Sequence, residues 1–188
     1  MNKETKKYTV LNYKGGTGKT CILVNIAHYL AKKGFKILIV DTDPQGSTSY
    51  HLGINSPNTL YDVITNTKNI NECIISARKN LDIIISNERL FPAEIYMHQQ
   101  KNRENILSDR LKKIDGQYDY ILLDCSPSIN LMNQNALLFS KNVMIPVSME
   151  YMSLVGIKQL IKNIQLLNKT FNDSIKASTS LGYFQVHS

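Results

Sequence analysis

The segment YKGGTGKT, from Tyr13 to Thr20, has the residue types and spacing of a loop that binds phosphate groups. Glycines let backbone N–H groups close around phosphate oxygens, and the N-terminus of a following helix adds partial positive charge. In such a loop the ammonium of Lys19 would reach the outer phosphates of a nucleoside triphosphate, and the hydroxyl of Thr20 would bind Mg²⁺. The alternative is a glycine-rich turn without a ligand. The residues predicted to contact a nucleotide are Gly15, Gly16, Thr17, Gly18, Lys19, Thr20 and Cys21.

A second lysine, Lys14, lies five residues before Lys19, and Tyr13 stands where the common pattern G-x-x-x-x-G-K-[ST] has its first glycine. Lys14 could be an ordinary surface residue beside the loop, or it could bring another positive charge to a phosphate. The residues of the loop alone leave both interpretations open. A dinucleotide-binding loop is excluded, because the pattern G-x-G-x-x-G is absent.

Carboxylates follow two apolar segments of the chain. The segment DTDPQGS places Asp41 and Asp43 two residues apart, so both side chains face the same way in an extended chain. Such a carboxylate could orient an attacking water molecule or hold a metal-bound one; alternatively, it could cap the turn that Pro44 and Gly46 imply. The segment YILLD ends in Asp124, at the place where a phosphate-loop enzyme has the acidic residue that completes its Mg²⁺ site.

Short apolar segments alternate with helical ones along the chain, which is typical of βαβ units and a parallel sheet. We therefore expect an α/β fold with a mostly parallel sheet and helices on both faces. Right-handed crossovers bring the carboxyl ends of such strands to one edge, where ligands bind, so the loop and the carboxylates would meet there. The predicted strands are Tyr8–Asn12, Lys36–Asp41, Leu81–Ser86, Tyr118–Asp124 and Asn142–Val147.

Two amphipathic helices are expected to pack on this sheet. The first covers Lys19–Lys33 and ends at Gly34, and the second covers residues 154–167 with Ser153 as its N-cap. Their predicted apolar stripes are Ile22, Ile26 and Leu30 in the first helix and Leu154, Ile157, Leu160, Ile161, Ile164 and Leu167 in the second. The remaining predictions are a helical region at Ala93–Ile114 with a break at Gln99–Asn105, and a further strand at Ile175–Phe184.

The composition is that of a globular protein, and 188 residues are enough for one well-buried domain. The longest apolar run, Ile37–Val40, is far too short to span a membrane, and the polar start MNKETKKYT is not a signal peptide. Three scattered cysteines and four scattered histidines favour neither disulfides nor a metal site, so a cytosolic protein is expected. The net charge of +7 fits either an acidic partner such as nucleic acid or a lysine-rich solvated surface.

Four segments together resemble one known family. In order, KGGTGKT, DTDPQGS, YILLDCSPS and VMIPVSMEYMSLVGIKQL follow the pattern of the ParA/Soj partition ATPases, which belong to the larger ParA/MinD group. The mark of that group is KGGxGK[ST], a deviant Walker A loop with an additional signature lysine, here Lys14. The resemblance runs from about Tyr8 to Leu167 and implies a Rossmann-like, three-layer P-loop NTPase fold.

The resemblance also implies roles for individual residues. Two monomers would bind ATP face to face, and Lys14 would cross to the phosphates of the partner, as an arginine finger does. Lys19 would hold phosphates, and Thr20 and Asp124 would complete the Mg²⁺ site. Asp43 would position the water for hydrolysis of ATP to ADP, with Asp41 supporting it. The family members are slow ATPases.

The resemblance implies partners as well. In the family the ATP-bound homodimer binds nonspecific DNA, and a ParB-like protein on a centromere-like site accelerates hydrolysis and releases the dimer. The protein would then segregate a plasmid or chromosome, in the cytoplasm and associated with the nucleoid. ATP binding must favour the dimer over the monomer for such coupling to work.

The chain departs from the family pattern at three places. Tyr13 stands where the family usually has Gln, and Ser126 replaces a proline; neither position binds phosphate. After the helix that closes near Lys169, the family continues with another strand and further helices that help to hold adenine and carry much of the DNA-binding surface. We therefore expect residues 1–188 to form a single domain that lacks the C-terminal part typical of the family.

Three other functions fit parts of the pattern. A MinD-like membrane-associated positioning ATPase would need a C-terminal amphipathic helix, and this chain has none. A reductase like the nitrogenase iron protein would need paired cysteines for a cluster between subunits, and the three cysteines are isolated. A nucleotide-binding regulatory module, or a remnant without turnover, would keep all the phosphate-site residues, so the sequence leaves this alternative open.

Overall fold

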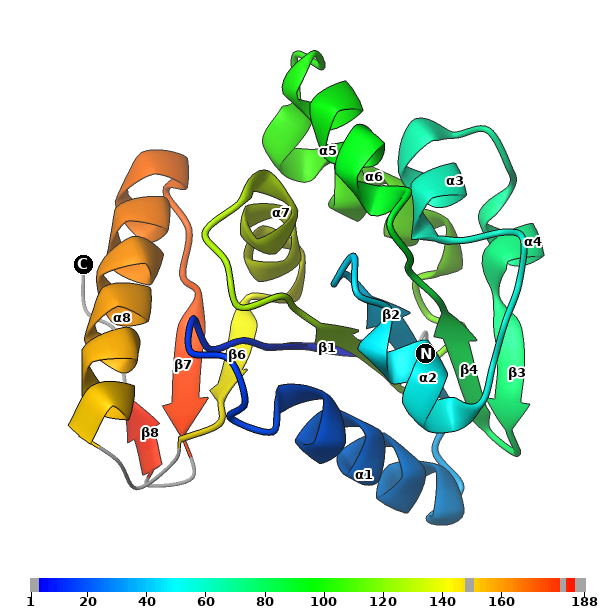
Figure 1. Ribbon diagram of the computed structural model, residues 1–188, viewed down its shortest axis with the longest axis horizontal. Coiled ribbons are helices and arrows are strands. Elements are labelled where there is room, and N and C mark those ends of the chain that lie inside the picture. Colours follow the sequence, from blue (N-terminus) through cyan, green and yellow to red (C-terminus); the bar gives the residue numbers. More distant parts are fainter. Residues whose placement is uncertain (1–3, 148–150, 180–181, 185–188) are drawn as a thin grey trace.

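Within the residues that the structure describes, 4–147, 151–179 and 182–184, the computed structural model forms one eight-stranded sheet (Figure 1). The strand order is β3-β4-β2-β5-β1-β6-β7-β8, and the strands from β4 to β7 run parallel. Strands β3 and β8, at the two edges, run antiparallel to their neighbours. The bounds are β1 (Lys6–Val10), β2 (Ile37–Asp41), β3 (Ile75–Arg78), β4 (Leu81–Ile84), β5 (Tyr120–Asp124), β6 (Asn142–Ile145), β7 (Lys176–Thr179) and β8 (Gly182–Phe184).

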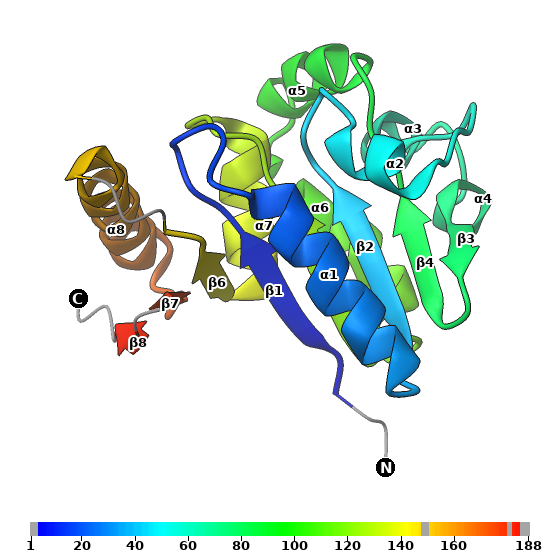
Figure 2. The ribbon, with the colours of Figure 1, turned by 60° about the horizontal axis from the view of Figure 1, so that its bottom comes forward.

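Helices cover both faces of the sheet, which confirms the predicted α/β architecture. Figure 2 shows α1 lying along β1 and β2 on one face, and Figure 1 shows α7 with α3, α5 and α6 on the other. The buried side chains of α8 belong to the same apolar cluster as those of α7. The helices are α1 (Lys19–Lys32), α2 (Ser47–Leu52), α3 (Leu60–Thr65), α4 (Ile70–Cys73), α5 (Leu90–His98), α6 (Ile106–Leu111), α7 (Leu131–Ser140) and α8 (Tyr151–Phe171), with 3₁₀ turns at Arg103–Asn105 and Lys112–Ile114.

The face that α1 turns to the sheet differs from the predicted stripe. Ile22 is 40% exposed, and Ile26 and Leu30 are only half-buried. Small side chains let the helix backbone come close to the strands, so the buried positions lie one residue further along the helix. These buried residues are Leu23, Ala27 and Ala31.

The last helix, α8, begins at Tyr151. Ser153 is therefore a residue of the helix, and the prediction that it is the N-cap was wrong. Most of its predicted stripe is confirmed, because Leu160, Ile164 and Leu167 are buried; Ile157 and Ile161 are half-buried, and the side chain of Leu154 lies outside the described residues. The region predicted as an interrupted helix does divide into α5 and α6, with the break between His98 and Ile106.

The predicted single strand at Ile175–Phe184 is two strands. β7 pairs parallel with β6, and the chain then reverses so that β8 pairs antiparallel with β7. A single strand of that length could not pair along its whole extent, because β6 offers only four residues, Asn142–Ile145. The sequence-based prediction also missed the edge strand β3 and the short helices α2, α3 and α4.

The register of the parallel strands brings the candidate site together. Asp124, the last residue of β5, is aligned with Val10 at the end of β1 and with Asp41 at the end of β2. The loop that follows β1 and the loop that follows β2 therefore start side by side with Asp124 between them. The glycine-rich loop, the segment with Asp41 and Asp43, and Asp124 therefore lie together at the carboxyl ends of the parallel strands, as predicted.

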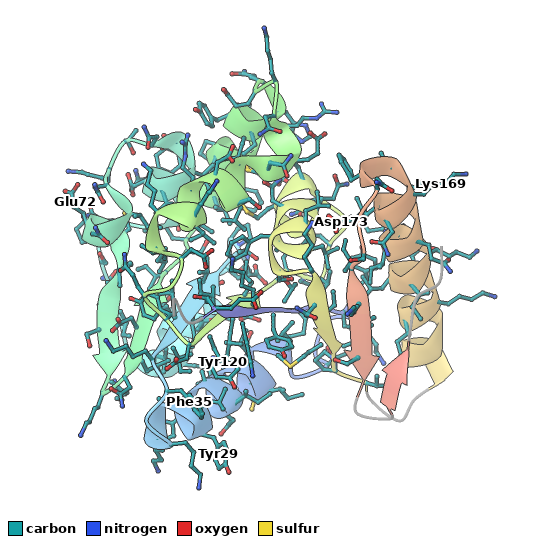
Figure 3. All side chains as sticks on the ribbon, turned by 180° about the vertical axis from the view of Figure 1, so that it is seen from behind. Tyr29, Phe35, Glu72, Tyr120, Lys169 and Asp173 are labelled. Atoms are coloured by element: carbon teal, nitrogen blue, oxygen red, sulfur yellow. The ribbon has the colours of Figure 1, made fainter. Side chains whose placement is uncertain are left out.

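Aromatic rings lie at the other end of the strands, beside the C-terminal end of α1 (Figure 3). The rings of Phe35 and Tyr120 meet edge to face with their centroids 5.4 Å apart. Lys6 lies over the ring of Tyr120, and Lys33 lies over the ring of Tyr29. Part of the positive charge is therefore carried at this end of the strands, away from the phosphate loop.

None of the helices in the described part of the chain is both long and apolar enough to cross a membrane.

Candidate functional site

The loop between β1 and α1 forms one wall of a pocket of about 360 Å³. Gly16 and Gly18 have φ angles of +72° and +78°, a backbone conformation that L side chains rarely adopt, and α1 starts directly after Gly18. The loop therefore needs its glycines to turn into the helix. The pocket is lined by Gly15, Gly16, Gly18, Lys19, Thr20 and Cys21, all predicted from the sequence, and by Asp43, Ser47, His51 and Pro127.

Lys19 is the cation at the floor of this pocket. Only 8% of its surface is exposed, and its Nζ lies 3.4 Å from the backbone oxygen of Lys14. Burial lowers the pKa of Lys19, and the nearby carboxylates of Asp124 and Asp43 partly offset that effect. A buried ammonium with so few strong acceptors would be stabilised by a phosphate in the pocket.

Asp124 lies behind the loop and is almost completely buried. Its Oδ2 accepts hydrogen bonds from the hydroxyls of Thr20 (2.6 Å) and Thr48 (2.7 Å). Its Oδ1 has no hydrogen-bond partner among the described residues, which is unusual for a buried carboxylate oxygen. Burial raises the pKa of Asp124.

These groups fit a magnesium ion. Mg²⁺ prefers oxygen ligands and keeps several of its water molecules, so one hydroxyl and one carboxylate suffice when a phosphate supplies the rest. The described residues contain no group of three or more His, Cys, Asp or Glu side chains that would hold a metal without such help. Thr20 and the unpaired oxygen of Asp124 therefore suit a metal that arrives with a nucleotide.

Asp41 supports the turn that carries Asp43. It is fully buried, its Oδ1 accepts from the N–H of Asp43 (3.0 Å) and its Oδ2 accepts from the N–H of Thr48 (3.2 Å). Burial raises the pKa of Asp41 well above its usual range, and the charge of Asp124 adds to this. Both oxygens are thus committed to the backbone, which ties β2 to the start of α2.

Asp43 lies in the turn and lines the pocket of the phosphate loop. Its Oδ1 accepts from the N–H of Gln45 (2.9 Å), so it caps the turn, as the alternative prediction stated. The turn closes at Gly46, where φ is +64° and a Cβ would lie 2.7 Å from the backbone oxygen of Ser86. Capping the turn and facing the pocket are compatible, because a carboxylate has two oxygens.

Lys14 is not one of the residues that line the phosphate-loop pocket in its own chain. It is half-buried, and its backbone is held on both sides. Its N–H donates to Oδ1 of Asn12 (2.9 Å), and its carbonyl accepts from Nζ of Lys19 and from the hydroxyl of Thr17, both at 3.4 Å. The two lysines of the loop therefore occupy different environments.

Sequence reasoning missed the pocket-lining residues Ser47, His51 and Pro127. It also missed two residues that support the site, Thr48 and Asn12. Thr48 shares Asp124 with Thr20, and Asn12 holds the backbone of Lys14. A polar residue two positions after the end of a strand, as Asn12 is after β1, could have suggested a role. Thr48 carries no such signal, because its contact with Asp124 spans 76 residues.

A second hollow of about 300 Å³ lies between α1 and the ends of β6 and β7. One of its lining residues, Ile22, lies two positions after Thr20, which lines the pocket of the phosphate loop. Its lining is mostly apolar, and the residues are Ile22, Ile26, Met144, Ile145, Pro146, Val147 and Ser178. The three cysteines are free thiols, with Cys21 exposed and Cys73 and Cys125 buried.

Asp124→Asn should stabilise the protein in the absence of nucleotide and flatten its dependence on pH. The raised pKa of Asp124 means that its carboxyl binds a proton more tightly in the folded state than in the unfolded chain. Ionisation of Asp124 therefore lowers the free energy of unfolding as pH rises above about 4. Urea denaturation at pH 5 and pH 8 measures the change. Asp109→Asn, at an exposed position, is the control.

A loss of stability at pH 8 would contradict this prediction. It would mean that the bonds from Thr20 and Thr48 to a charged oxygen outweigh the burial of that charge. Asp41 is less suitable for the test, because both of its oxygens accept backbone N–H groups and an amide nitrogen would meet one of them.

Comparison with known proteins agrees with this geometry. A family model described as an AAA domain matches residues 5–177. The chromosome partitioning protein ParA of Myxococcus xanthus is 37% identical over 171 residues, which cover 89% of this chain and 60% of that protein. The sporulation initiation inhibitor protein Soj of Bacillus subtilis is 37% identical over 174 residues, which cover 90% of this chain and 69% of that protein. The chain thus spans about two thirds of these relatives.

Solved structures show the same fold. A plasmid partition protein from Borrelia burgdorferi, bound to AMPPNP, superposes with a TM-score of 0.82 at 26% identity, covering 94% of this chain and 75% of that one. A cobyrinic acid a,c-diamide synthase from Mycobacterium smegmatis, with a bound ATP analogue and magnesium, superposes with a TM-score of 0.86 at 26% identity, covering 93% and 74%. By fold, motif order and sequence identity, this chain belongs to the ParA/Soj family of P-loop partition proteins.

Proposed function

We propose that this protein binds ATP with Mg²⁺ and hydrolyses it slowly, as a partition ATPase. The observation that carries the proposal is the pocket lined by the buried Lys19 and by Thr20, whose hydroxyl donates to the buried carboxylate of Asp124, a residue with one unpaired oxygen. The B. burgdorferi relative was crystallised with AMPPNP and the M. smegmatis protein with an ATP analogue and magnesium, which supports this choice of ligand.

Each residue of the pocket has a defined task in this proposal. The loop amides and Lys19 bind the β- and γ-phosphates, and Thr20 and Asp124 hold Mg²⁺, which when bound neutralises developing charge on the phosphates. Asp43 orients the attacking water, and Asp41 holds the turn that places Asp43 at the pocket. The apolar hollow beside Ile22 and Pro146 would take the adenine ring.

Lys14 acts on the nucleotide of a second protomer. Its place outside the pocket of its own chain supports this role, since a lysine of the same loop would otherwise duplicate Lys19. Two protomers facing each other across their nucleotides would exchange these lysines symmetrically. The nucleotide then stabilises the dimer, because part of its binding site is on the other chain.

We extend the proposal to the role in the cell. The ATP-bound dimer binds DNA without sequence preference, and a ParB-like protein at a centromere site stimulates hydrolysis, so the protein would associate with the nucleoid and segregate a plasmid or chromosome. The net charge of +7 and the exposed lysines support contact with DNA. The relatives named as chromosome partitioning proteins support the role in segregation.

Lys19→Gln should weaken binding of Mg·ATP by about 10- to 100-fold, because it removes a charge-assisted contact with the phosphates. Titration with a fluorescent ATP analogue measures the affinity. The matched control is Lys32→Gln, an exposed lysine at the far end of the same helix, which should leave the affinity within about twofold of wild type.

Equal affinities of Lys19→Gln and wild type would reject the pocket as the phosphate site. Normal ATP binding by wild type without measurable hydrolysis would instead favour the second candidate, a nucleotide-binding regulatory module. The same set of residues supports binding in both cases, so hydrolysis distinguishes them.

A further inference from the structure

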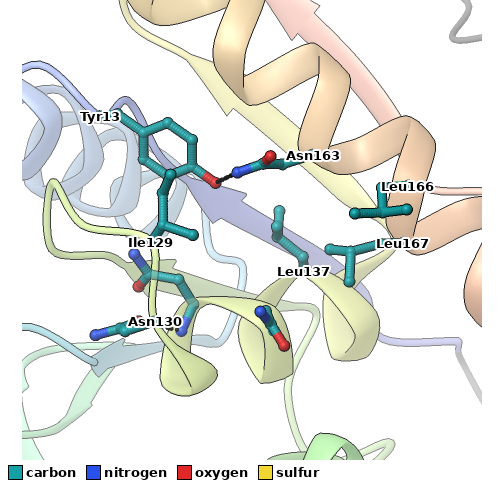
Figure 4. A pocket seen from close by; sticks show the side chains of 9 residues that line it. Tyr13, Ile129, Asn130, Leu137, Asn163, Leu166 and Leu167 are labelled. Carbon is teal, nitrogen blue, oxygen red and sulfur yellow. Dashed lines mark hydrogen bonds between the residues drawn. The ribbon is translucent and has the colours of Figure 1, made fainter.

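Helix α8 touches the loop that carries Lys14. The side-chain amide of Asn163, on α8, donates a hydrogen bond of 3.0 Å to the hydroxyl of Tyr13. Figure 4 shows the Tyr13 ring beside Ile129 with its hydroxyl directed at Asn163. This contact joins residues 150 positions apart in the sequence. Tyr13 is the residue directly before Lys14, so the bond ties α8 to the backbone from which the lysine side chain leaves.

A second contact links the same two parts of the chain. The buried amide of Asn12 donates to the backbone oxygen of Pro146 (2.7 Å) and accepts from the N–H of Lys14 (2.9 Å). Gly156 of α8 lies against this amide, so close that a Cβ there would be 3.4 Å from Oδ1 of Asn12 and 4.0 Å from Cβ of Lys14. Helix α8 therefore contacts this part of the chain at two separate points, through the side chain of Asn163 and through Gly156.

Packing alone does not hold the Tyr13 side chain. The ring lies at a cavity of about 130 Å³, which is also lined by Leu137, Asn163 and Leu167, so there is space into which the ring could shift. Burial raises the pKa of Tyr13 and the bond from Asn163 partly opposes this, so the phenol stays neutral at physiological pH. The ring packs against the apolar core and also borders the cavity, so the hydrogen bond from Asn163 adds to packing in fixing its position.

We infer that Tyr13 and Asn163 are positioning residues for Lys14. The inference rests on the proposed function, in which Lys14 reaches the nucleotide of a second protomer. Through the Tyr13–Asn163 bond, α8 holds the segment Asn12–Lys14 in one conformation, so that the lysine leaves the loop in the direction that an opposing protomer requires. Without the bond the loop still binds phosphate through Lys19 and its glycines, but Lys14 samples more orientations and contributes less.

The test compares the rate of hydrolysis per dimer with the affinity of the monomer for ATP, because the inference predicts a change in the first and not in the second. Tyr13→Phe removes the hydroxyl and keeps the ring, and Asn163→Ala removes the donor. Each should lower hydrolysis per dimer by about fivefold, the effect of one ordinary hydrogen bond, and should leave the affinity of the monomer for ATP within about twofold. The double variant should be no slower than the slower single variant, since both changes remove the same bond. The control is Gln165→Ala, at an exposed position of the same helix, which should match wild type.

Two further variants separate positioning from a general effect on folding. Asn163→Asp should restore most of the activity, because the phenol can donate to the new carboxylate. In a Lys14→Gln background, Asn163→Ala should have no further effect on hydrolysis or on ATP-dependent dimerisation. A purely structural role would instead lower the melting temperature and the ATP affinity in both backgrounds.

The outcomes also separate this inference from the proposed function. If Lys14→Gln abolishes dimerisation while Tyr13→Phe and Asn163→Ala behave as wild type, the positioning role is wrong and the role of Lys14 stands. If Lys14→Gln dimerises and hydrolyses ATP normally, the role of Lys14 fails and the positioning role fails with it. Sedimentation velocity with Mg·ATP reports dimerisation independently of turnover.

Discussion

Asp43→Ala should retain ATP binding and lose hydrolysis by about 100-fold or more, which would leave the ATP-bound state long-lived. The reason is that Asp43 lines the pocket of the phosphate loop but is not part of the Thr20–Asp124 pair, so its loss removes the group that orients water and spares the groups that bind phosphate and metal. Release of phosphate in single-turnover reactions measures hydrolysis, and nucleotide titration measures binding.

The structure offers a sharper version of this experiment. Asp43 also caps its turn by accepting from the N–H of Gln45, so alanine could act by loosening the turn. Asp43→Asn keeps an oxygen for that hydrogen bond and removes the charge. It should be as inactive as Asp43→Ala, and Gln45→Ala, which keeps the backbone N–H, should hydrolyse ATP within about twofold of wild type. Normal hydrolysis by Asp43→Asn would assign Asp43 to the turn alone.

Mixing Lys14→Gln with Asp43→Ala, two proteins that should each be inactive, is expected to restore hydrolysis. In a mixed dimer, the protomer with wild-type Asp43 can receive Lys14 from the other protomer, whereas its own loop carries glutamine. If chains pair at random, half of the dimers are mixed and one of their two sites is complete, so recovery reaches at most roughly a quarter of the wild-type rate per site. Activity per molecule of wild type should likewise rise with protein concentration.

Lys19 provides the matched control for this experiment. If Lys19 acts on the nucleotide of its own chain, mixing Lys19→Gln with Asp43→Ala leaves no complete site, and hydrolysis should not recover. The two lysines lie five residues apart in one loop, yet only one should complement. Failure of Lys14→Gln to complement, although mixed dimers demonstrably form, would show that Lys14 acts within its own chain.

Much of the fold was predictable from local pattern. Alternating apolar and helical segments indicated a parallel sheet, and the ends of β1, β2 and β5 lie at one edge because right-handed crossovers leave little choice. The glycines of the phosphate loop were predictable for a similar reason, since the φ values of +72° and +78° at Gly16 and Gly18 favour that residue type. Such features depend on neighbours in sequence.

Several local predictions failed where packing competed with propensity. Ile22 is more apolar than Ala27, yet Ala27 faces the sheet, because the distance between helix and sheet decides which side chains fit. The strand predicted at Ile175–Phe184 is two antiparallel strands, because β7 can pair only as far as β6 extends. Ser153 lies inside α8, which begins three residues earlier than the apolar pattern alone indicated.

The sequence by itself determined which groups could do chemistry in this protein: a lysine and glycines for phosphate, a hydroxyl and carboxylates for metal and water, and a second lysine five residues before the first. Tertiary structure alone decided how these groups are held. Thr48 meets Asp124 across 76 residues, Asn12 meets Pro146 across 134, and Tyr13 meets Asn163 across 150. Contacts of this kind depend on strand register and helix position, which the whole packed core sets and no local pattern encodes.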